Sequence, residues 1–131
     1  MLRQGRVTGF IPTKSFGVAK AFYGETLGLK LIAEEPYALV FECGGTRIRV
    51  VEVKAYVPFA FTLLGWEVDD LERTVTALAK GGVAFERYPW MEQDSLGIWT
   101  APNGAQVAWF KDPDGNVLSL ACHARETRVT R

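Results

Sequence analysis

The sequence predicts an α+β fold built from two βαβββ halves. The order strand, helix and three strands occurs twice along the chain, at an offset of roughly fifty residues. Both helical segments have apolar residues at the spacing of one helix face, and the strand-like runs that follow them are short. Because the turns between these runs are tight, we expect antiparallel hairpins rather than crossover connections within each half.

Composition and charge exclude several classes of protein. The 131 residues are expected to form a single domain, since 48% are hydrophobic and 23% are charged, as in ordinary globular proteins. Equal numbers of basic and acidic residues, 15 of each, argue against a nucleic acid as partner. The sequence shows neither the apolar core of a signal peptide nor a run long enough to cross a bilayer. We therefore expect a cytoplasmic protein without a membrane partner.

The first half is assigned to residues 7–53. An alternating run at 7–13 predicts the first strand, and Ser15 is a suitable N-cap for the helix that follows it. Gly28 suits the left-handed end of that helix. The apolar face of the helix comprises Phe16, Ala19, Phe22, Tyr23 and Leu27. Three further strands are expected, at 29–34, 37–43 and 46–53.

The second half is assigned to residues 61–123, after a connector at 54–60. Its helix has Asp69 or Asp70 as N-cap. The buried stripe of this helix comprises Leu71, Val75 and Leu78. Strands are expected at 61–68, 83–88, 96–101, 106–112 and 116–123. The remaining segment, 124–131, is polar and lacks an apolar period, so we expect a flexible tail.

One face of each predicted sheet has no helix to cover it. A sheet with a single helix buries only the face on which that helix packs. Pairing the two halves therefore either buries the second face or curves it around a ligand. The pattern of apolar residues does not choose between these two outcomes.

Three stretches of the chain resemble one known family. They are AFYGETLGLKL after the first strand, WEVDDLERTVTALAKGG around the end of the fifth, and DPDGNVLSL near the end. In this order and spacing they are similar to the glyoxalase, bleomycin-resistance and extradiol-dioxygenase group, the vicinal oxygen chelate superfamily, over residues 7–122. The resemblance implies two βαβββ modules that form a cup-shaped, mostly antiparallel sheet with helices on its outer face. It also implies a homodimer and, in the family's enzymes, one divalent metal in the cup.

The metal-ligand positions of the family are occupied by poor donors in this chain. The resemblance places Thr8, Leu63 and Ser119 where the first, fifth and last strands of family enzymes offer ligands. In the fourth strand, Glu52 is the only residue able to serve. Leucine has no donor atom, and neutral hydroxyls are weak ligands for a site that needs carboxylate or imidazole groups. We therefore expect no metal and no cofactor, and we interpret Ser119 as a sign of metal loss.

Aromatic residues, which make up 12% of the chain, are the candidates for lining a cup without a metal. Alternation places Phe10 on the inward face with Thr8, and Trp66 on the opposite face toward the second helix. For the strand at 106–112, alternation allows two inward pairs, which are Val107 with Trp109 and Ala108 with Phe110. The predicted ligand-binding residues are Thr8, Phe10, Leu63, Trp90, Trp99, Trp109 and Ser119.

Three functions are compatible with these residues. An aromatic cup favours a small-molecule binding protein of the bleomycin-resistance type, which would hold a flat aromatic or antibiotic-like ligand and act in antibiotic resistance. The alternative is a divergent lyase, isomerase or dioxygenase with an atypical metal site, or with Glu52 or Glu67 as base. A third is a scaffold for association, with a collapsed cup. The sequence does not decide whether the protein is an enzyme.

Overall fold

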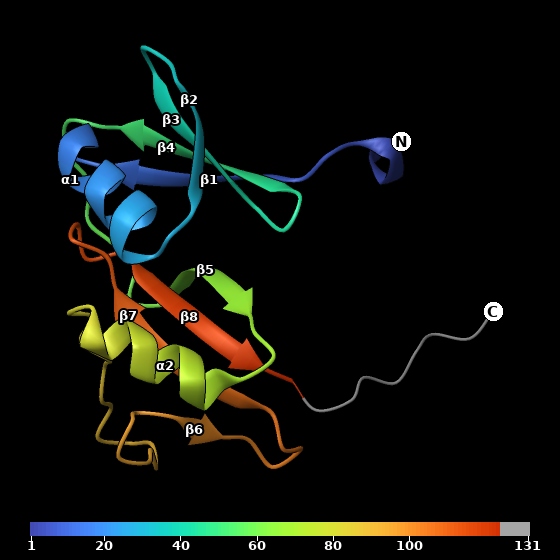
Figure 1. Ribbon diagram of the computed structural model, residues 1–131, viewed down its shortest axis with the longest axis vertical. Coiled ribbons are helices and arrows are strands. Elements are labelled where there is room, and N and C mark those ends of the chain that lie inside the picture. Colours follow the sequence, from blue (N-terminus) through green and yellow to red (C-terminus); the bar gives the residue numbers. More distant parts are fainter. Residues whose placement is uncertain (124–131) are drawn as a thin grey trace.

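The computed structural model describes residues 1–123 and contains two four-stranded sheets (Figure 1). In spatial order, the first sheet consists of β1 (Thr8–Thr13), β4 (Thr46–Glu52), β3 (Ala38–Cys43) and β2 (Lys30–Glu34). The second consists of β5 (Thr62–Glu67), β8 (Val117–Cys122), β7 (Gln106–Lys111) and β6 (Trp99–Thr100). Only the pairs β1–β4 and β5–β8 are parallel. The predicted α+β class with mostly antiparallel pairing is therefore confirmed; the expectation for 124–131 lies outside the described residues.

The helices lie on the same side of the two sheets (Figure 1). The N-terminal turn η1 (Leu2–Gln4) is followed, after β1, by α1 (Phe16–Lys20), which continues directly into the wider π-helical turns of η2 (Ala21–Thr26). As predicted, the Ser15 hydroxyl accepts a hydrogen bond from the Val18 N–H, 3.4 Å away. In the second half α2 (Leu71–Lys80) starts in the same way, with the Asp70 carboxylate accepting from the Arg73 N–H at 3.1 Å.

One hydrophobic core spans both halves of the chain. Its largest fully buried apolar side chains come from the helix-facing sides of both sheets and from η2, and they are Tyr23, Phe41, Phe110, Ile11, Leu118 and Val50. The rings of Phe22 and Phe110 lie 6.5 Å apart and connect the first helical segment to the second sheet. Trp66 also packs on this side, with its ring stacked 6.5 Å from that of Phe110. The helix-covered faces are therefore buried together, and the opposite faces remain open.

The strand expected at 83–88 was a wrong prediction. In this segment only Phe85 forms a bridge, with Phe110, and the strand expected at 96–101 is reduced to β6. Side chains take over the backbone hydrogen bonds that a strand ladder would have used. The Gln93 amide accepts from the Tyr88 N–H at 2.8 Å and donates to the carbonyls of Glu86 and Gly97 at 3.0 and 2.8 Å.

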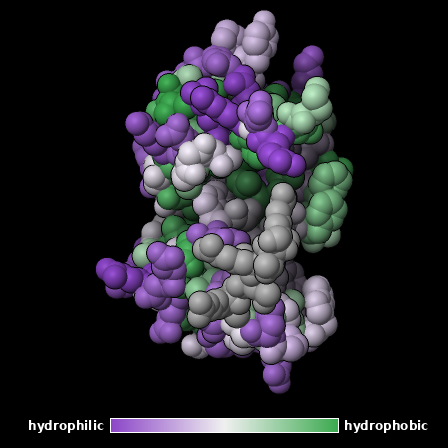
Figure 2. Space-filling model, turned by 90° about the vertical axis from the view of Figure 1, so that its right-hand side faces the viewer, coloured by the Kyte–Doolittle hydropathy of each residue, from purple (hydrophilic) through white to green (hydrophobic). Residues whose placement is uncertain are grey.

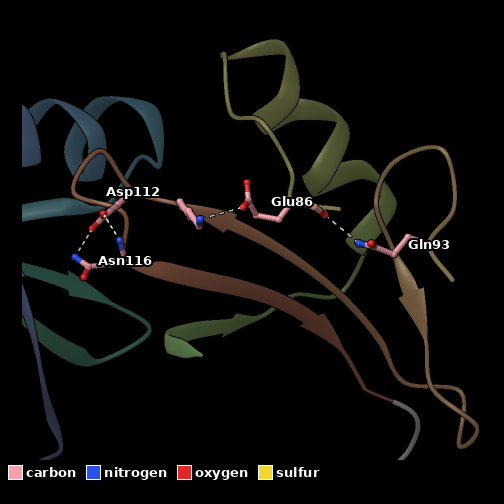
Figure 3. Close-up of polar contacts among 5 residues, drawn as sticks. Glu86, Gln93, Asp112 and Asn116 are labelled. Atoms are coloured by element: carbon pink, nitrogen blue, oxygen red, sulfur yellow. Dashed lines mark hydrogen bonds and ion pairs between the residues drawn. The ribbon is translucent and has the colours of Figure 1, made fainter. Parts of the chain in front are cut away.

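A buried polar turn before β8 connects the two halves. The Asp112 carboxylate accepts a hydrogen bond from the Tyr23 hydroxyl at 2.6 Å. It also accepts one from the side chain of Asn116 at 2.8 Å (Figure 3). Burial and the neighbouring Asp112 raise the pKa of Tyr23 well above its usual value, so this hydroxyl remains a donor. Asp114 accepts from the Thr13 hydroxyl at 2.6 Å. The turn thereby fixes the first half relative to the second.

Candidate functional site

The open face of the first sheet presents two arginines and one exposed aromatic ring. On β1 the buried residue Ile11 alternates with Thr8 and Phe10, and the Phe10 ring is 59% exposed. Across the β1–β4 ladder, Thr8 is paired with Arg47 and Phe10 with Arg49. On the side of the molecule drawn in Figure 2, hydrophilic residues predominate over the upper half and hydrophobic residues lie in the hollow between the halves.

The open face of the second sheet has a different set of side chains. Gly65, Ser119 and Trp109 are direct neighbours across β5, β8 and β7. Of the two inward pairs that alternation allowed, Ala108 and Phe110 are completely buried on the helix side. The β7 residues on the open face are therefore Val107 and Trp109. The Ser119 side chain occupies the space beside Gly65, because a Cβ atom added at Gly65 would lie only 2.5 Å from Ser119 Oγ.

A cleft of about 670 Å³ opens on this face, and we call it the aromatic cleft. Tyr88 and Trp90 from the loop before β6 and Trp109 from β7 form one group of lining rings, with ring centroids 5.0 Å apart for Tyr88–Trp90 and 5.8 Å for Tyr88–Trp109. Phe59 and Phe61, from the segment that leads into β5, form a second group and stack at 4.8 Å with an angle of 11°. The remaining lining residues are Pro58, Ala60, Thr62, Met91, Lys111, Gly115 and Val117.

Hydrogen bonds fix the Trp109 ring and the loop that contains Trp90. The indole N–H of Trp109 donates to the Thr62 hydroxyl at 3.2 Å, which sets the plane of that ring. The loop with Trp90 is held by Gln93 at its centre and by Arg87, which donates to the carbonyls of Asp94 and Ser95 at 2.7 and 2.8 Å. This loop is therefore organised by its own side chains before any ligand binds.

The predicted ligand-binding residues lie in three places. Trp90 and Trp109 line the aromatic cleft, the Trp99 ring is 6.2 Å from that of Trp109, and Ser119 is opposite Trp109 in the ladder. Thr8 and Phe10 lie on the open face of the other sheet. At a bulge in β5, Leu63 lines a second pocket of about 280 Å³, which shares Phe59 and Val117 with the aromatic cleft.

Sequence reasoning missed Phe59, Phe61, Tyr88 and Lys111 as lining residues of the cleft. The alternation of Phe59 and Phe61 across Ala60 was a usable signal, because it places two rings on one side of an extended segment. This signal was overlooked because residues 54–60 were assigned to a connector. No comparable signal exists for Tyr88, which reaches the cleft only because Gln93 shapes its loop.

The two carboxylates considered as bases lie at strand ends. Glu52 follows the alternation of the buried residues Ile48 and Val50, and its carboxylate accepts from the Phe16 N–H at 3.4 Å. Its side chain is thus on the helix side of the sheet. Glu67 is 73% exposed, and its carboxylate lies 3.4 Å from Nε2 of His123.

The family resemblance seen in the sequence is confirmed by a match to a protein-family model. The model for the Glyoxalase/Bleomycin resistance protein/Dioxygenase superfamily matches residues 3–120. The chain belongs to this superfamily. No protein of curated function matches the sequence.

Solved structures of the superfamily have the same fold. A glyoxalase-family protein from Bacillus anthracis is 20% identical with a TM-score of 0.72, and the match covers 92% of this chain and 96% of that one. Lactoylglutathione lyase from Agrobacterium tumefaciens is 16% identical with a TM-score of 0.69, over 90% and 92% of the two chains. TnmS3, an antibiotic binding protein from Streptomyces sp. CB03234, is 26% identical with a TM-score of 0.69, over 95% and 99%.

The residues at the superfamily's metal positions do not fit a divalent cation. Leu63 offers no donor, Thr8 and Ser119 offer neutral hydroxyls, and Glu52 is directed to the helix side. Among residues 1–123 there is no group of three or more His, Cys, Asp or Glu side chains that could hold a metal ion. Within the same residues, no helix is long and apolar enough to cross a membrane.

Proposed function

We propose that this superfamily member is a small-molecule binding protein that holds a flat aromatic or antibiotic-like compound in the aromatic cleft without using a metal. The observation that supports this most directly is the set of exposed aromatic rings that line one cleft. Phe59, Phe61 and Trp90 are 61%, 63% and 75% exposed, although rings of this size are normally buried. A planar ligand in the cleft would remove this apolar surface from water and stack on the rings.

The likeness to TnmS3 supports the same proposal. That protein is described as an antibiotic binding protein, and its chain is covered almost completely by the match. A binding role of this kind would give resistance by sequestering a compound rather than by changing it. We expect the protein to act in the cytoplasm as a homodimer, as the family resemblance implies.

A thermal-shift screen of planar aromatic antibiotics and metabolites tests the proposal. A ligand that binds only the folded state stabilises it, by about 2.7 kcal/mol at a hundredfold excess over Kd. Hits should raise the Tm of the protein and lose this effect in Trp109→Ala. A broad panel without a single Trp109-dependent shift would contradict the proposal.

The enzyme hypothesis makes a different prediction about metal content. Protein purified without chelators should contain no stoichiometric transition metal if the binding proposal holds. Stoichiometric zinc, iron, nickel or manganese would instead favour a lyase, isomerase or dioxygenase. If an activity is found, its retention in Glu67→Gln would remove the base proposed for a metal-free enzyme.

A further inference from the structure

Lys111 is the only charged side chain among the described residues that line the aromatic cleft. It ends β7, two residues after Trp109, and therefore lies on the same open face of the sheet. All other lining residues are uncharged, and most are apolar or aromatic. A ligand that enters the cleft thus meets several aromatic rings and one ammonium group.

The Lys111 ammonium has a single ion-pair partner among residues 1–123, and this pair is open to solvent. Its Nζ lies 3.3 Å from the Glu86 carboxylate, which is one of the contacts drawn in Figure 3. The Lys111 side chain is 50% exposed and that of Glu86 is 30% exposed. Glu86 does not line the cleft. The ammonium can therefore turn toward a ligand in the cleft at the modest cost of a surface ion pair.

Lys111 also affects the ionisation of Tyr88, one of the rings that line the cleft. The pKa of Tyr88 is raised by burial and by Glu86, while Lys111 acts in the opposite direction. The phenol of Tyr88 consequently stays neutral near neutral pH and can act as a hydrogen-bond donor. An ammonium and a phenol in one cleft are both suited to a ligand oxygen that bears negative charge.

We propose that the aromatic cleft selects anionic planar aromatic compounds, such as fused-ring carboxylates or acidic phenols, whose oxyanion binds Lys111. This inference rests on the proposed function and adds the charge of the ligand to it. The rings of Phe59, Phe61 and Trp109 hold the planar part, and the ammonium group sets the orientation. A cationic aromatic compound would have to approach Lys111 without a compensating carboxylate in the cleft lining, and it should bind most weakly.

Three probes with the same ring system and different charge test this proposal. They are anthracene carboxylate, its neutral carboxamide and an aminomethyl anthracene cation. Quenching of tryptophan fluorescence gives a Kd for each of them with the intact protein. We expect the carboxylate to bind about tenfold tighter than the carboxamide, as for a hydrogen bond between charged groups, and the cation to bind more weakly than both.

Two substitutions make the test specific to Lys111. Lys111→Met keeps the apolar stem but removes the charge, and it should bring the Kd values of carboxylate and carboxamide together without weakening the carboxamide. Glu86→Gln removes the competing carboxylate, and it should increase the preference for the carboxylate.

Equal affinity for the carboxylate and the carboxamide would overturn the proposed charge preference, as would a preference that survives in Lys111→Met. Tightest binding of the cation would overturn it as well. In each of these cases the proposed aromatic-binding function would still stand. If none of the three ring compounds binds, both proposals fail.

Discussion

The two modules share one strand order but present different open faces. In the first, Arg47 and Arg49 flank Phe10, and Arg49 is paired with Glu35. In the second, the same place in the topology is occupied by Gly65, Ser119 and Trp109, next to the aromatic cleft. The repeated topology determines which face is open, whereas the side chains at alternate positions determine what that face can bind.

The hairpin turns of the two modules differ in the same way. Gly44 and Gly45 connect β3 to β4 with positive φ angles of 56° and 81°, and they have no side chains to contact the other module. The corresponding turn between β7 and β8 contains Asp112, which accepts from Tyr23 of the first module. The second module therefore contributes both the cleft and the main polar contact between the modules.

The largest effect is expected for Asp112→Ala. This change leaves the Tyr23 hydroxyl without its buried acceptor, removes one of the two hydrogen bonds that the Asn116 side-chain amide donates, and removes the bond from the Asn116 backbone N–H that shapes the turn. We expect the free energy of unfolding to fall by about 3 kcal/mol, measured by urea denaturation. Thr46→Ala, at the matching turn of the first module, should change it by less than about 0.5 kcal/mol. Similar losses of unfolding free energy in the two variants would contradict the proposed difference between the two turns.

A smaller effect is expected for a matched pair of aromatic substitutions on the two open faces. Trp109→Ala removes a ring that lines the cleft and is oriented by Thr62, so it should weaken binding of anthracene carboxylate about thirtyfold. Phe10→Ala, on the first module, should change the Kd by less than about threefold. Fluorescence titration of both variants against the unchanged protein measures the difference. If only Phe10→Ala lost affinity, the ligand would bind on the first module, which would contradict the account.

The smallest effect is expected for Gly65→Ala. The added Cβ would meet Ser119 Oγ at 2.5 Å, and the hydroxyl can rotate away, so we expect a loss of about 1 kcal/mol in unfolding free energy. The same change in a Ser119→Ala background should cost much less. An equal cost in both backgrounds would show that the Ser119 hydroxyl does not limit the size of the side chain at position 65.

The fold could be predicted because it depends on local patterns. Capping at Ser15 and Asp70, the apolar helix faces and the tight glycine turns are all encoded within a few residues. The segment at 83–88 was mispredicted because two of its backbone groups, the Glu86 carbonyl and the Tyr88 N–H, bond to the side chain of Gln93 instead of to a neighbouring strand. Alternation cannot anticipate a side chain that replaces a strand partner.

The candidate site was predictable only in part, since it combines distant segments. Alternation correctly separated Trp66 on the helix side from Gly65 on the open face, but it left Trp109 undecided. Trp109 lies on the open face because its neighbour Phe110 is buried in the core on the helix side, which is a tertiary effect. Nothing in the local sequence indicates that Phe61 and Tyr88 line the same cleft.

The central claim is that the ligand binds in the aromatic cleft and not on the open face of the first sheet, and the indole N–H signals of the tryptophans report on it directly. Trp90 and Trp109 line the aromatic cleft, while Trp66 packs in the core and serves as an internal control. In an NMR titration with anthracene carboxylate, we predict that the indole signals of Trp90 and Trp109 shift and that of Trp66 does not. Shifts confined to the backbone amides of Phe10 and Arg49, with all indole signals unmoved, would contradict the account.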